Sequence, residues 1–395
     1  MNRRELIAFA AALPALTCGG GLIAAPRSPA RFLLVFLRGG YDCANLLVPY
    51  SSPFYYEARP RIAIPRPQAG ALSGAIALDA DWALAGAVRE SVGPLYERGE
   101  AAFVPFAGTD DVSRSHFETQ DSLELGQPVA GARDFRSGFL ARLATVVNGA
   151  APIAFTDSLP LVFRGSTDIP NISLKALGKP AFDARQADIL QAMYAGHHLR
   201  AAVADGLELR QEVARAMEDE MLAANRGAVT TKGFELEAAR IGRLMREQYN
   251  LGFVDVGGWD THVNEGGAQG PLATGLESLG RGLRTFADTL GPEWKSTVVL
   301  VVSEFGRTFR ENGNAGTDHG HGSVYWVLGG GLKGGRVVGA QQRVTAATLF
   351  QDRDYPVLND YRAVLAGLFR RMWGLSAAPL EQVFPSTEPR DLGLL

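Results

Sequence analysis

The chain alternates between short, continuously apolar runs and longer segments with helical periodicity. The apolar runs have the length of strands and are RFLLVFL (31–37), AAFVPFA (101–107), APIAFT (151–156), LGFVDVGG (251–258), STVVLVVSEF (296–305) and SVYWVLGGG (323–331). A run that is apolar at nearly every position indicates a strand buried on both faces. Helical periodicity is found between these runs and after the last one, at 82–98, 116–125, 137–148, 233–249, 271–290, 345–350 and 361–373.

This alternation predicts an α/β fold with a mostly parallel central sheet flanked by helices on both faces. One stretch stands apart from it. Residues near 183–249 are rich in Ala, Leu, Glu and Arg with helical periodicity, which predicts an added helical region. No tandem repeat or linker composition divides the chain, so residues 26–395 are predicted to form a single domain.

The first 25 residues have the pattern of an export signal. Arg3 and Arg4 precede an apolar stretch that ends in small residues. The arginine pair, followed by Leu6, favours the twin-arginine route; the alternatives are a chance pair before an ordinary secretory signal, or an anchor. Pro14 interrupts the apolar stretch, so no stable membrane span is expected after cleavage. These features predict a periplasmic or secreted protein.

The composition of the chain argues against one class of binding partner, nucleic acid. The 395 residues are 46% hydrophobic and carry a net charge of −3, with no strongly basic stretch, so nucleic acid is not an expected partner. Cys18 is predicted to leave with the signal, which leaves Cys43 alone and allows no internal disulfide. Packing, and a bound metal if there is one, must therefore stabilise the mature chain.

Carboxylates and imidazoles follow four of the predicted strands. In open α/β sheets, ligands bind beyond the carboxyl ends of the strands. The candidate metal ligands at these positions are Asp42, Asp260, His262, Glu304, His319 and His321. Mixed nitrogen and oxygen donors favour one or two divalent ions, best Zn²⁺ or Mn²⁺, with Mg²⁺ and Ca²⁺ as alternatives.

Each candidate also has a purely structural interpretation. Asp42 follows two glycines and would cap a turn, and Asp318, which precedes His319, is a common turn residue. Glu304 ends a buried strand and must be paired or bound, for which Arg307 would suffice. His197 and His198 lie in the helical region and are interpreted as ordinary surface or core histidines.

Ser115 has two interpretations. SHFE (115–118) matches a capping box, in which serine and glutamate satisfy the first N–H groups of a helix. A hydroxyl at a helix N-terminus is also well placed for anion chemistry, and a neighbouring metal would make it a nucleophile. Ser113 is the rival for that role.

Taken together, the loops resemble a known family. RGGYDCAN, SRSHFETQDSLELG, GGWDTH, SEFGRT and DHGHG occur in this order behind an Arg-Arg leader. This set is similar to the bacterial domain-of-unknown-function family 1501, which belongs to the alkaline phosphatase and sulfatase-like superfamily. The resemblance covers essentially the whole mature chain and implies an alkaline phosphatase-like fold.

The resemblance implies hydrolysis or transfer of phosphate or sulfate esters at a site with one or two metal ions. Asp42 matches the ligand after the first strand, Ser115 is similar in position to the nucleophile, and Asp260 with His262 matches a later ligand pair. Glu304 stands where the superfamily usually has Asp-His-Gly, and His319 and His321 would replace the missing histidine. Cys43 lacks the sequence context that sulfatase maturation needs, so a formylglycine-type sulfatase is not expected.

The prediction is an exported, metal-dependent hydrolase of phosphate or sulfate esters. Its substrate would be an anionic small molecule or a glycan ester, with Ser115 as nucleophile and Arg307 as anion clamp. The alternative is a catalytically degenerate, metal-containing binding protein of the cell envelope. A redox copper site is a third interpretation, disfavoured because no Met or Cys lies near the histidines. The sequence identifies no protein partner.

Overall fold

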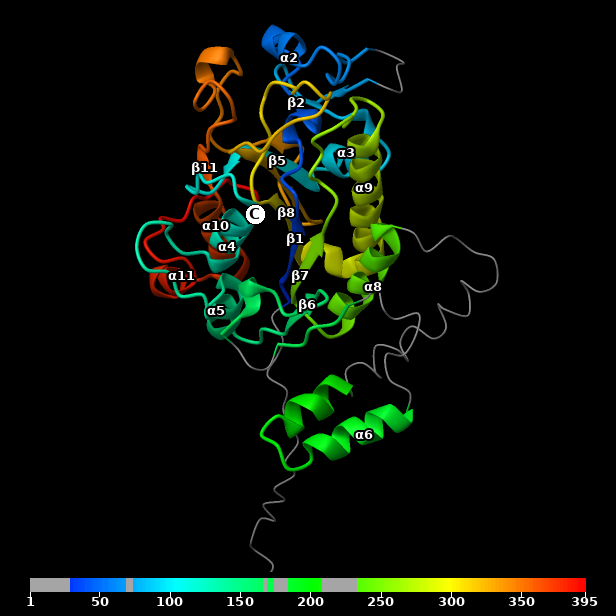
Figure 1. Cartoon of the computed structure of the whole chain (residues 1–395), viewed down its shortest axis with the longest axis vertical. Helices are drawn as coiled ribbons and strands as arrows, with labels where there is room; N and C mark the ends of the chain where they lie inside the picture. Colours follow the sequence, from blue (N-terminus) through cyan, green and yellow to red (C-terminus); the bar gives the residue numbers. More distant parts are fainter. Residues whose placement is uncertain (1–28, 69–73, 166–168, 174–183, 208–232) are drawn as a thin grey trace, which may run out of the picture.

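An eight-stranded sheet forms the centre of the fold (Figure 1). The computed structural model describes residues 29–68, 74–165, 169–173, 184–207 and 233–395. The strand order is β10-β5-β9-β8-β1-β7-β6, with β11 paired to β5. The strands are β1 (Arg31–Leu37), β5 (Ala101–Gly108), β6 (Pro152–Phe155), β7 (Leu251–Val256), β8 (Thr297–Ser303), β9 (Ser323–Leu328), β10 (Arg336–Val337) and β11 (Asn359–Asp360).

The sheet is mostly parallel, as predicted. β1 lies between β7 and β8 and is parallel to both, and β6 is parallel to β7. β9 is antiparallel to its two neighbours, β8 and β5. The chain returns from β8 to β9 through a loop without a crossover helix, and such a direct return reverses the strand direction. That loop carries much of the candidate site.

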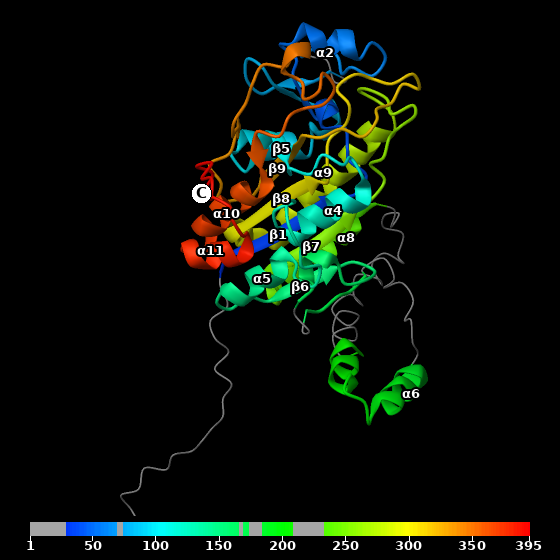
Figure 2. The same ribbon diagram turned by 60° about the vertical axis from the view of Figure 1, so that its left-hand side comes forward.

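Helices cover both faces of the sheet (Figures 1 and 2). Alternate side chains of β1 point to opposite faces, so its unbroken apolar sequence serves two cores. Leu33 and Val35 belong to the core formed with α8 (Phe234–Glu247) and α9 (Pro271–Leu290). Phe32 and Leu34 belong to the other core. The helices on that face are α4 (His116–Leu125), α5 (Phe139–Val146), α10 (Tyr361–Trp373) and α11 (Ala377–Val383).

The helix predicted over 82–98 is wrong. Ala83 and Leu84 instead form β4 in a small antiparallel sheet of order β2-β4-β3, and α3 covers only Val92–Glu97. The two apolar residues pair with β2 and β3 and are buried there, so sheet packing overrides the weak helical pattern. The other members of this layer are β2 (Leu47–Val48), β3 (Ile76–Ala77) and α2 (Pro53–Ala58). Similarly, the helix expected at 345–350 is only a 3₁₀ turn, Ala346–Thr348.

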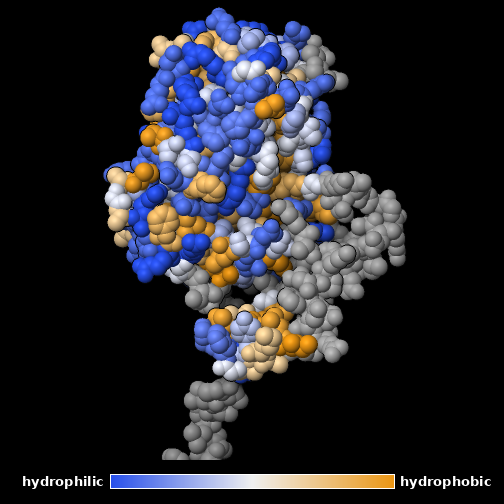
Figure 3. All heavy atoms as spheres, in the orientation of Figure 1, coloured by the Kyte–Doolittle hydropathy of each residue, from blue (hydrophilic) through white to orange (hydrophobic). Residues whose placement is uncertain are grey.

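The predicted helical region contains α6 (Ala184–Tyr194) and α8, while residues 1–28 and 208–232 lie outside the described part of the chain. α6 lies outside the layers that cover the sheet (Figures 1 and 2). Among the described helices, none combines the length and the apolar character that crossing a membrane requires. On the face shown in Figure 3, hydrophilic side chains predominate, and hydrophobic ones gather near α5 and on the segment that carries α6.

Candidate metal centre

The candidate site lies at the carboxyl ends of the central strands. β1, β7 and β8 are adjacent and parallel, so the loops that follow them start at the same edge of the sheet. The segment between β5 and α4 reaches this edge as well, because the α4 residue His116 contacts Glu304, which directly follows β8. Loops from four distant parts of the sequence therefore meet here.

Three histidines surround one carboxylate. Ligand atoms of His116, Asp260 and His319 all lie within 4.8 Å of one another. His262 adjoins them, with its Nε2 at 2.9 Å from Oδ1 of Asp260 and at 3.2 Å from Nε2 of His319. Nε2 of His116 lies 3.6 Å from Oδ2 of Asp260. We call these four residues the imidazole cluster.

The other ring nitrogen of each histidine contacts a group that can only accept a hydrogen bond. The acceptors are Oε1 of Glu304 for His116 at 2.8 Å, Oδ1 of Asp318 for His262 at 3.2 Å and the carbonyl oxygen of Arg114 for His319 at 3.0 Å. A carboxylate or a carbonyl receives a proton from its partner, so each Nδ1 carries the hydrogen. A ring in this tautomer directs its Nε2 lone pair toward Asp260.

Converging lone pairs require a cation. Nε2 of His262 and Nε2 of His319 face each other at 3.2 Å, a separation that repels unless a proton or a metal ion lies between them. Nε2 of His116 is buried and has no hydrogen-bond partner among the described residues. Three imidazole nitrogens and one carboxylate form a donor set that suits Zn²⁺, with the Nδ1 acceptors fixing the ring orientations. The residues present thus fit a divalent metal.

Asp260 is kept ionised by a buried arginine. Nη2 of Arg307 donates to Oδ1 of Asp260 at 2.7 Å. Burial alone would raise the pKa of Asp260, but the charge of Arg307 and its hydrogen bond outweigh burial and lower the pKa. Nε and Nη1 of Arg307 are buried without a partner among the described residues. Arg307 therefore lies behind Asp260, with two of its three guanidinium nitrogens unused as donors.

Glu304 lies behind His116. Its Oε1 accepts hydrogen bonds from the backbone N–H of Gly39 at 2.8 Å, from Nδ1 of His116 at 2.8 Å and from Nε2 of Gln120 at 2.9 Å. Its Oε2 accepts from the hydroxyl of Ser303 at 2.9 Å. The hydrogen bonds from His116 and Gln120 lower the pKa of Glu304 despite its burial, and the bond to Glu304 raises the pKa of His116. Glu304 is thus placed to orient a ligand rather than to face the cluster itself.

Two glycines allow the loops to approach. Gly39 has a φ of +126°, and a Cβ there would lie 2.7 Å from the backbone nitrogen of Asp260. Gly320 separates the two histidines of the last loop, and a Cβ on it would lie 2.4 Å from the carbonyl carbon of Arg307. Phe305 packs under the cluster, with its ring 5.0 Å from the rings of both His116 and His319. These contacts hold the rings at fixed positions.

Five of the predicted residues lie outside the cluster, and of these Glu304 and Arg307 pair with cluster members. The other three have different partners. Asp42 is buried and forms an ion pair with Arg59 through both carboxylate oxygens. His321 packs its ring against Phe350 at 5.0 Å, and burial lowers its pKa. Ser115 is the N-cap of α4, with its hydroxyl accepting from the backbone N–H of Glu118 at 3.5 Å. The structure therefore unites Asp260, His262 and His319 and places Glu304 next to them.

His116 is the cluster member that the sequence alone did not single out. It lies in the loop region after β5 and is the first residue of α4, directly after Ser115. The signal that would have found it is its position, since it follows a strand end as the other candidates do. The SHFE pattern instead indicates a role for Ser115, because it matches a capping box.

A second buried charged network adjoins the site. Glu265 accepts hydrogen bonds from the hydroxyls of Thr261 and Thr317, both at 2.8 Å, and these threonines lie next to Asp260 and Asp318. Burial, and then the negative charge of Asp42, raise the pKa of Glu265 to about 9. The network therefore holds a protonated Glu265 that connects the two ligand-bearing loops.

This raised pKa predicts how stability depends on pH. The folded chain keeps a proton on Glu265 that the unfolded chain releases above about pH 4.5, so stability is full below that pH and is lost as pH rises toward 9. We expect the free energy of unfolding to fall between pH 5 and 9, by at most about 1.4 kcal/mol per pH unit. Urea denaturation across this range should give a flatter profile for Glu265→Gln. The control is Glu277→Gln on the surface of α9; a Glu265→Gln profile as steep as that of the wild type would contradict the assignment.

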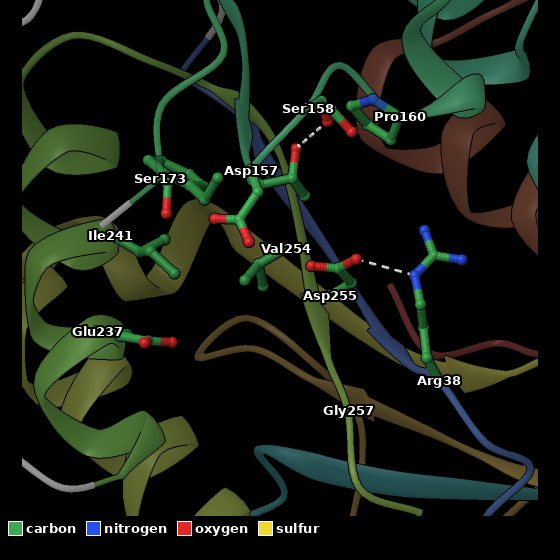
Figure 4. A pocket seen from close by; sticks show the side chains of 12 residues that line it. Arg38, Asp157, Ser158, Pro160, Ser173, Glu237, Ile241, Val254, Asp255 and Gly257 are labelled. Atoms are coloured by element: carbon green, nitrogen blue, oxygen red, sulfur yellow. Dashed lines mark hydrogen bonds and ion pairs between the residues drawn. The ribbon is translucent and has the colours of Figure 1, made fainter. Parts of the chain in front are cut away.

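A cavity of about 290 Å³ lies beside the site at the carboxyl ends of β6 and β7 (Figure 4). Its lining mixes polar and apolar residues, and the polar ones include Asp157, Ser158, Ser173, Glu237 and Asp255. Arg38 pairs with Asp255 at 2.8 Å and donates to Gln120, which in turn donates to Glu304. A chain of hydrogen bonds through Arg38, Gln120 and Glu304 therefore connects the cavity to His116.

Comparisons with known proteins identify a family and several distant structures. The profile of the family described as "Protein of unknown function (DUF1501)" matches residues 29–384. No match was found among curated proteins. Similar solved structures include a protein in the alkaline phosphatase superfamily from Vibrio parahaemolyticus, with 12% identity, a TM-score of 0.40 and coverage of 93% of this chain and 70% of that chain.

Two further structures are similar at the same level. The lipoteichoic acid synthase LtaP from Listeria monocytogenes has 8% identity and a TM-score of 0.42, with coverage of 93% of this chain and 76% of its own. Ps i-CgsB, in complex with k-i-k-neocarrahexaose, has 9% identity and a TM-score of 0.37, with coverage of 92% and 75%. Likeness of this extent carries no conclusion about activity.

Proposed function

The chain belongs to the family described as protein of unknown function DUF1501, and from that premise we propose that it is a metal-dependent hydrolase of phosphate or sulfate esters. The observation that carries the proposal is the convergence of three imidazole Nε2 atoms on the carboxylate of Asp260. A bound divalent cation would remove the repulsion between these converging donor atoms. A cavity at the carboxyl ends of β6 and β7 is connected to the cluster by hydrogen bonds through Arg38, Gln120 and Glu304.

The imidazole cluster would hold the ion. His116, His262, His319 and Asp260 offer the ligands for one ion, with Zn²⁺ or Mn²⁺ as the best candidates. When bound, the ion supplies Lewis acidity that polarises an ester oxygen and stabilises developing negative charge. Asp42 and His321 were predicted as further ligands, and a second ion that used them would need both side chains to leave their present contacts.

Residues around the cluster orient its imidazole rings and keep Asp260 ionised. Glu304, Asp318 and the carbonyl of Arg114 keep the three rings in the tautomer that can bind metal. Arg307 keeps Asp260 ionised, and its two unused nitrogens, Nε and Nη1, would serve as an anion clamp after a small opening of the site. Together these groups would bind an anionic ester next to the ion.

Ser115 is the proposed nucleophile, and its two interpretations are separable. We expect Ser115→Ala to lower turnover at least about 1,000-fold and to lower the free energy of unfolding by about 1 kcal/mol through loss of the cap. Ser115→Asp keeps a capping oxygen but no hydroxyl, so it should lose the same activity and retain stability. Steady-state rates and urea denaturation distinguish the two effects. Activity of Ser115→Ala within tenfold of the wild type would leave Ser115 as a cap only.

The alternative is a metal-containing binding protein of the cell envelope. It is favoured by the engagement of the Ser115 hydroxyl with the N–H of Glu118 rather than with a histidine. A periplasmic or secreted location, by way of an export signal in residues 1–25, and an anionic small-molecule or glycan ester substrate belong to the same proposal for either function.

Elemental analysis followed by an ester panel tests the proposal. The protein, purified after export, should contain about one equivalent of Zn or Mn, and it should hydrolyse aryl phosphate or aryl sulfate esters in a metal-dependent way. Protein that folds without retaining any divalent metal would refute the hydrolase. Metal retention with saturable binding of anions and no turnover would establish the binding alternative.

A further inference from the structure

Arg114 has an unusual backbone conformation next to the site. Its φ is +54°, in the left-handed region that side chains other than those of Gly, Asn and Asp seldom adopt. It lies between Ser113 and Ser115, directly before α4. A strained residue persists only when its surroundings hold it there. Arg114 is held in this conformation by its side chain, and its carbonyl contacts the imidazole cluster.

The side chain of Arg114 is anchored to a buried carboxylate from a distant part of the sequence. Its Nε and Nη2 lie 2.8 Å and 2.6 Å from Oδ2 of Asp354, which is fully buried. Nη2 also donates to Oε1 of Gln351 at 2.7 Å. The guanidinium therefore meets the turn at 350–354 through three close, charge-assisted contacts, two of them with a carboxylate oxygen.

The carbonyl of Arg114 points to the imidazole cluster. It lies 3.0 Å from Nδ1 of His319, and it is the group that fixes the hydrogen of that ring on Nδ1. An αR or extended conformation at Arg114 would turn this carbonyl away, because φ and ψ set its direction. The strained backbone of Arg114 is thus what directs its carbonyl toward His319.

The turn at 350–354 is fastened to the same loop that carries His319. Asp354 forms a β-bridge with Thr308, and the backbone N–H of Phe309 donates to the carbonyl of Arg353 at 2.9 Å. Arg307, next to Thr308, forms a bridge with His319. Asp354 therefore spans from the backbone that positions His319 to the side chain of Arg114, and it closes a rigid ring of contacts.

We propose that Arg114 is a positioning residue, anchored by Asp354, whose backbone carbonyl holds His319 with its proton on Nδ1 and its Nε2 lone pair toward Asp260. The proposal rests on the metal centre proposed above and deepens it. Neither Arg114 nor Asp354 would touch the metal or the substrate. Both would act through His319, and losing such an outer partner typically weakens metal binding 10- to 100-fold.

The test reads the tautomer directly in metal-free protein. Long-range ¹H–¹⁵N spectra of ¹⁵N-histidine-labelled protein at pH 8.5 report which nitrogen of each ring is protonated, with His319→Gln used to assign the His319 signals. We expect Nδ1–H at His319 in the wild type and a measurable Nε2–H population in Asp354→Asn. Zinc affinity of Asp354→Asn, measured by chelator competition, should fall about 10- to 100-fold.

Asp352→Asn is the matched control. Asp352 lies in the same turn and pairs with Arg310 on the surface, so its removal should leave the His319 tautomer and zinc affinity unchanged. If Asp354→Asn does not fold, Arg114→Ala keeps the carbonyl and the unfavourable positive φ but removes the anchor, and it should show the same change of tautomer.

Several results would overturn the proposal. One is a wild-type His319 with its proton on Nε2. Another is a folded Asp354→Asn or Arg114→Ala with an unchanged tautomer and zinc affinity within twofold of the wild type. A wild type that binds no zinc, yet loses Nδ1–H at His319 in Asp354→Asn, would refute the metal function and support the positioning role.

Discussion

His319→Ala is expected to abolish metal binding, whereas His321→Ala is expected to leave the metal in place. The two histidines are separated by one glycine and look equivalent in the sequence. In the structure, Nε2 of His319 faces Asp260 and His262, while the ring of His321 packs against Phe350. Removing a direct ligand should lower metal affinity more than about 100-fold, because loss of an outer hydrogen-bond partner alone costs 10- to 100-fold.

Metal content and ester turnover of the two variants decide this prediction. His319→Ala should retain less than about a tenth of an equivalent of metal, and His321→Ala should match the wild type. His198→Ala is the control for a histidine that is exposed and remote from the sheet. Equal loss of metal in His319→Ala and His321→Ala would show that both histidines reach the ion, as the sequence predicted, and that the His321 ring leaves Phe350 when metal binds.

Arg59→Met is expected to destabilise the protein by about 3–5 kcal/mol, because it would leave Asp42 ionised and buried without its partner. Both side chains are essentially inaccessible to water. The charge of Arg59 lowers the pKa of Asp42 although burial alone would raise it. Urea denaturation measures the loss, and metal analysis of the folded fraction shows whether the imidazole cluster still binds its ion.

A double variant separates the ion pair from a metal-ligand role of Asp42. Asp42→Asn removes the buried charge, so combining it with Arg59→Met should recover stability with a coupling energy of about 1–3 kcal/mol. Arg98→Met, which breaks an exposed pair with Glu100, should cost no more than about 1 kcal/mol. A cost below that level for Arg59→Met would mean that another cation compensates Asp42, as expected if Asp42 binds metal.

The α/β fold and the family were predictable from the sequence because they depend on local patterns. A continuous apolar run such as Arg31–Leu37 has to be buried on both faces, which requires a central strand with helices on either side. The predicted bounds of α9, 271–290, coincide with those observed, because its apolar stripe is long and regular. The helix predicted at 82–98 did not form as such, because pairing with β2 draws Ala83 and Leu84 into a strand.

The rule that ligands bind beyond the carboxyl ends of parallel strands also pointed to the candidate metal centre. It identified Asp260, His262 and His319 as candidates, because parallel strands bring their following loops to one edge of the sheet. That rule uses only the order of strands and the residues that follow them. It cannot say which way a side chain points, nor which charged groups become neighbours after the loops fold.

The sequence by itself therefore determined the layered architecture, the family and the edge of the sheet where the candidate site lies, since these follow from hydrophobic periodicity, loop motifs and chain order. Only the tertiary structure decided which polar residues are ligand candidates and which support them. Asp42 meets Arg59, His321 meets Phe350, and Glu304 meets His116 across 188 residues of sequence. A buried carboxylate or imidazole takes its role from the nearest opposite charge or acceptor, and those neighbours come from loops whose approach no local pattern encodes.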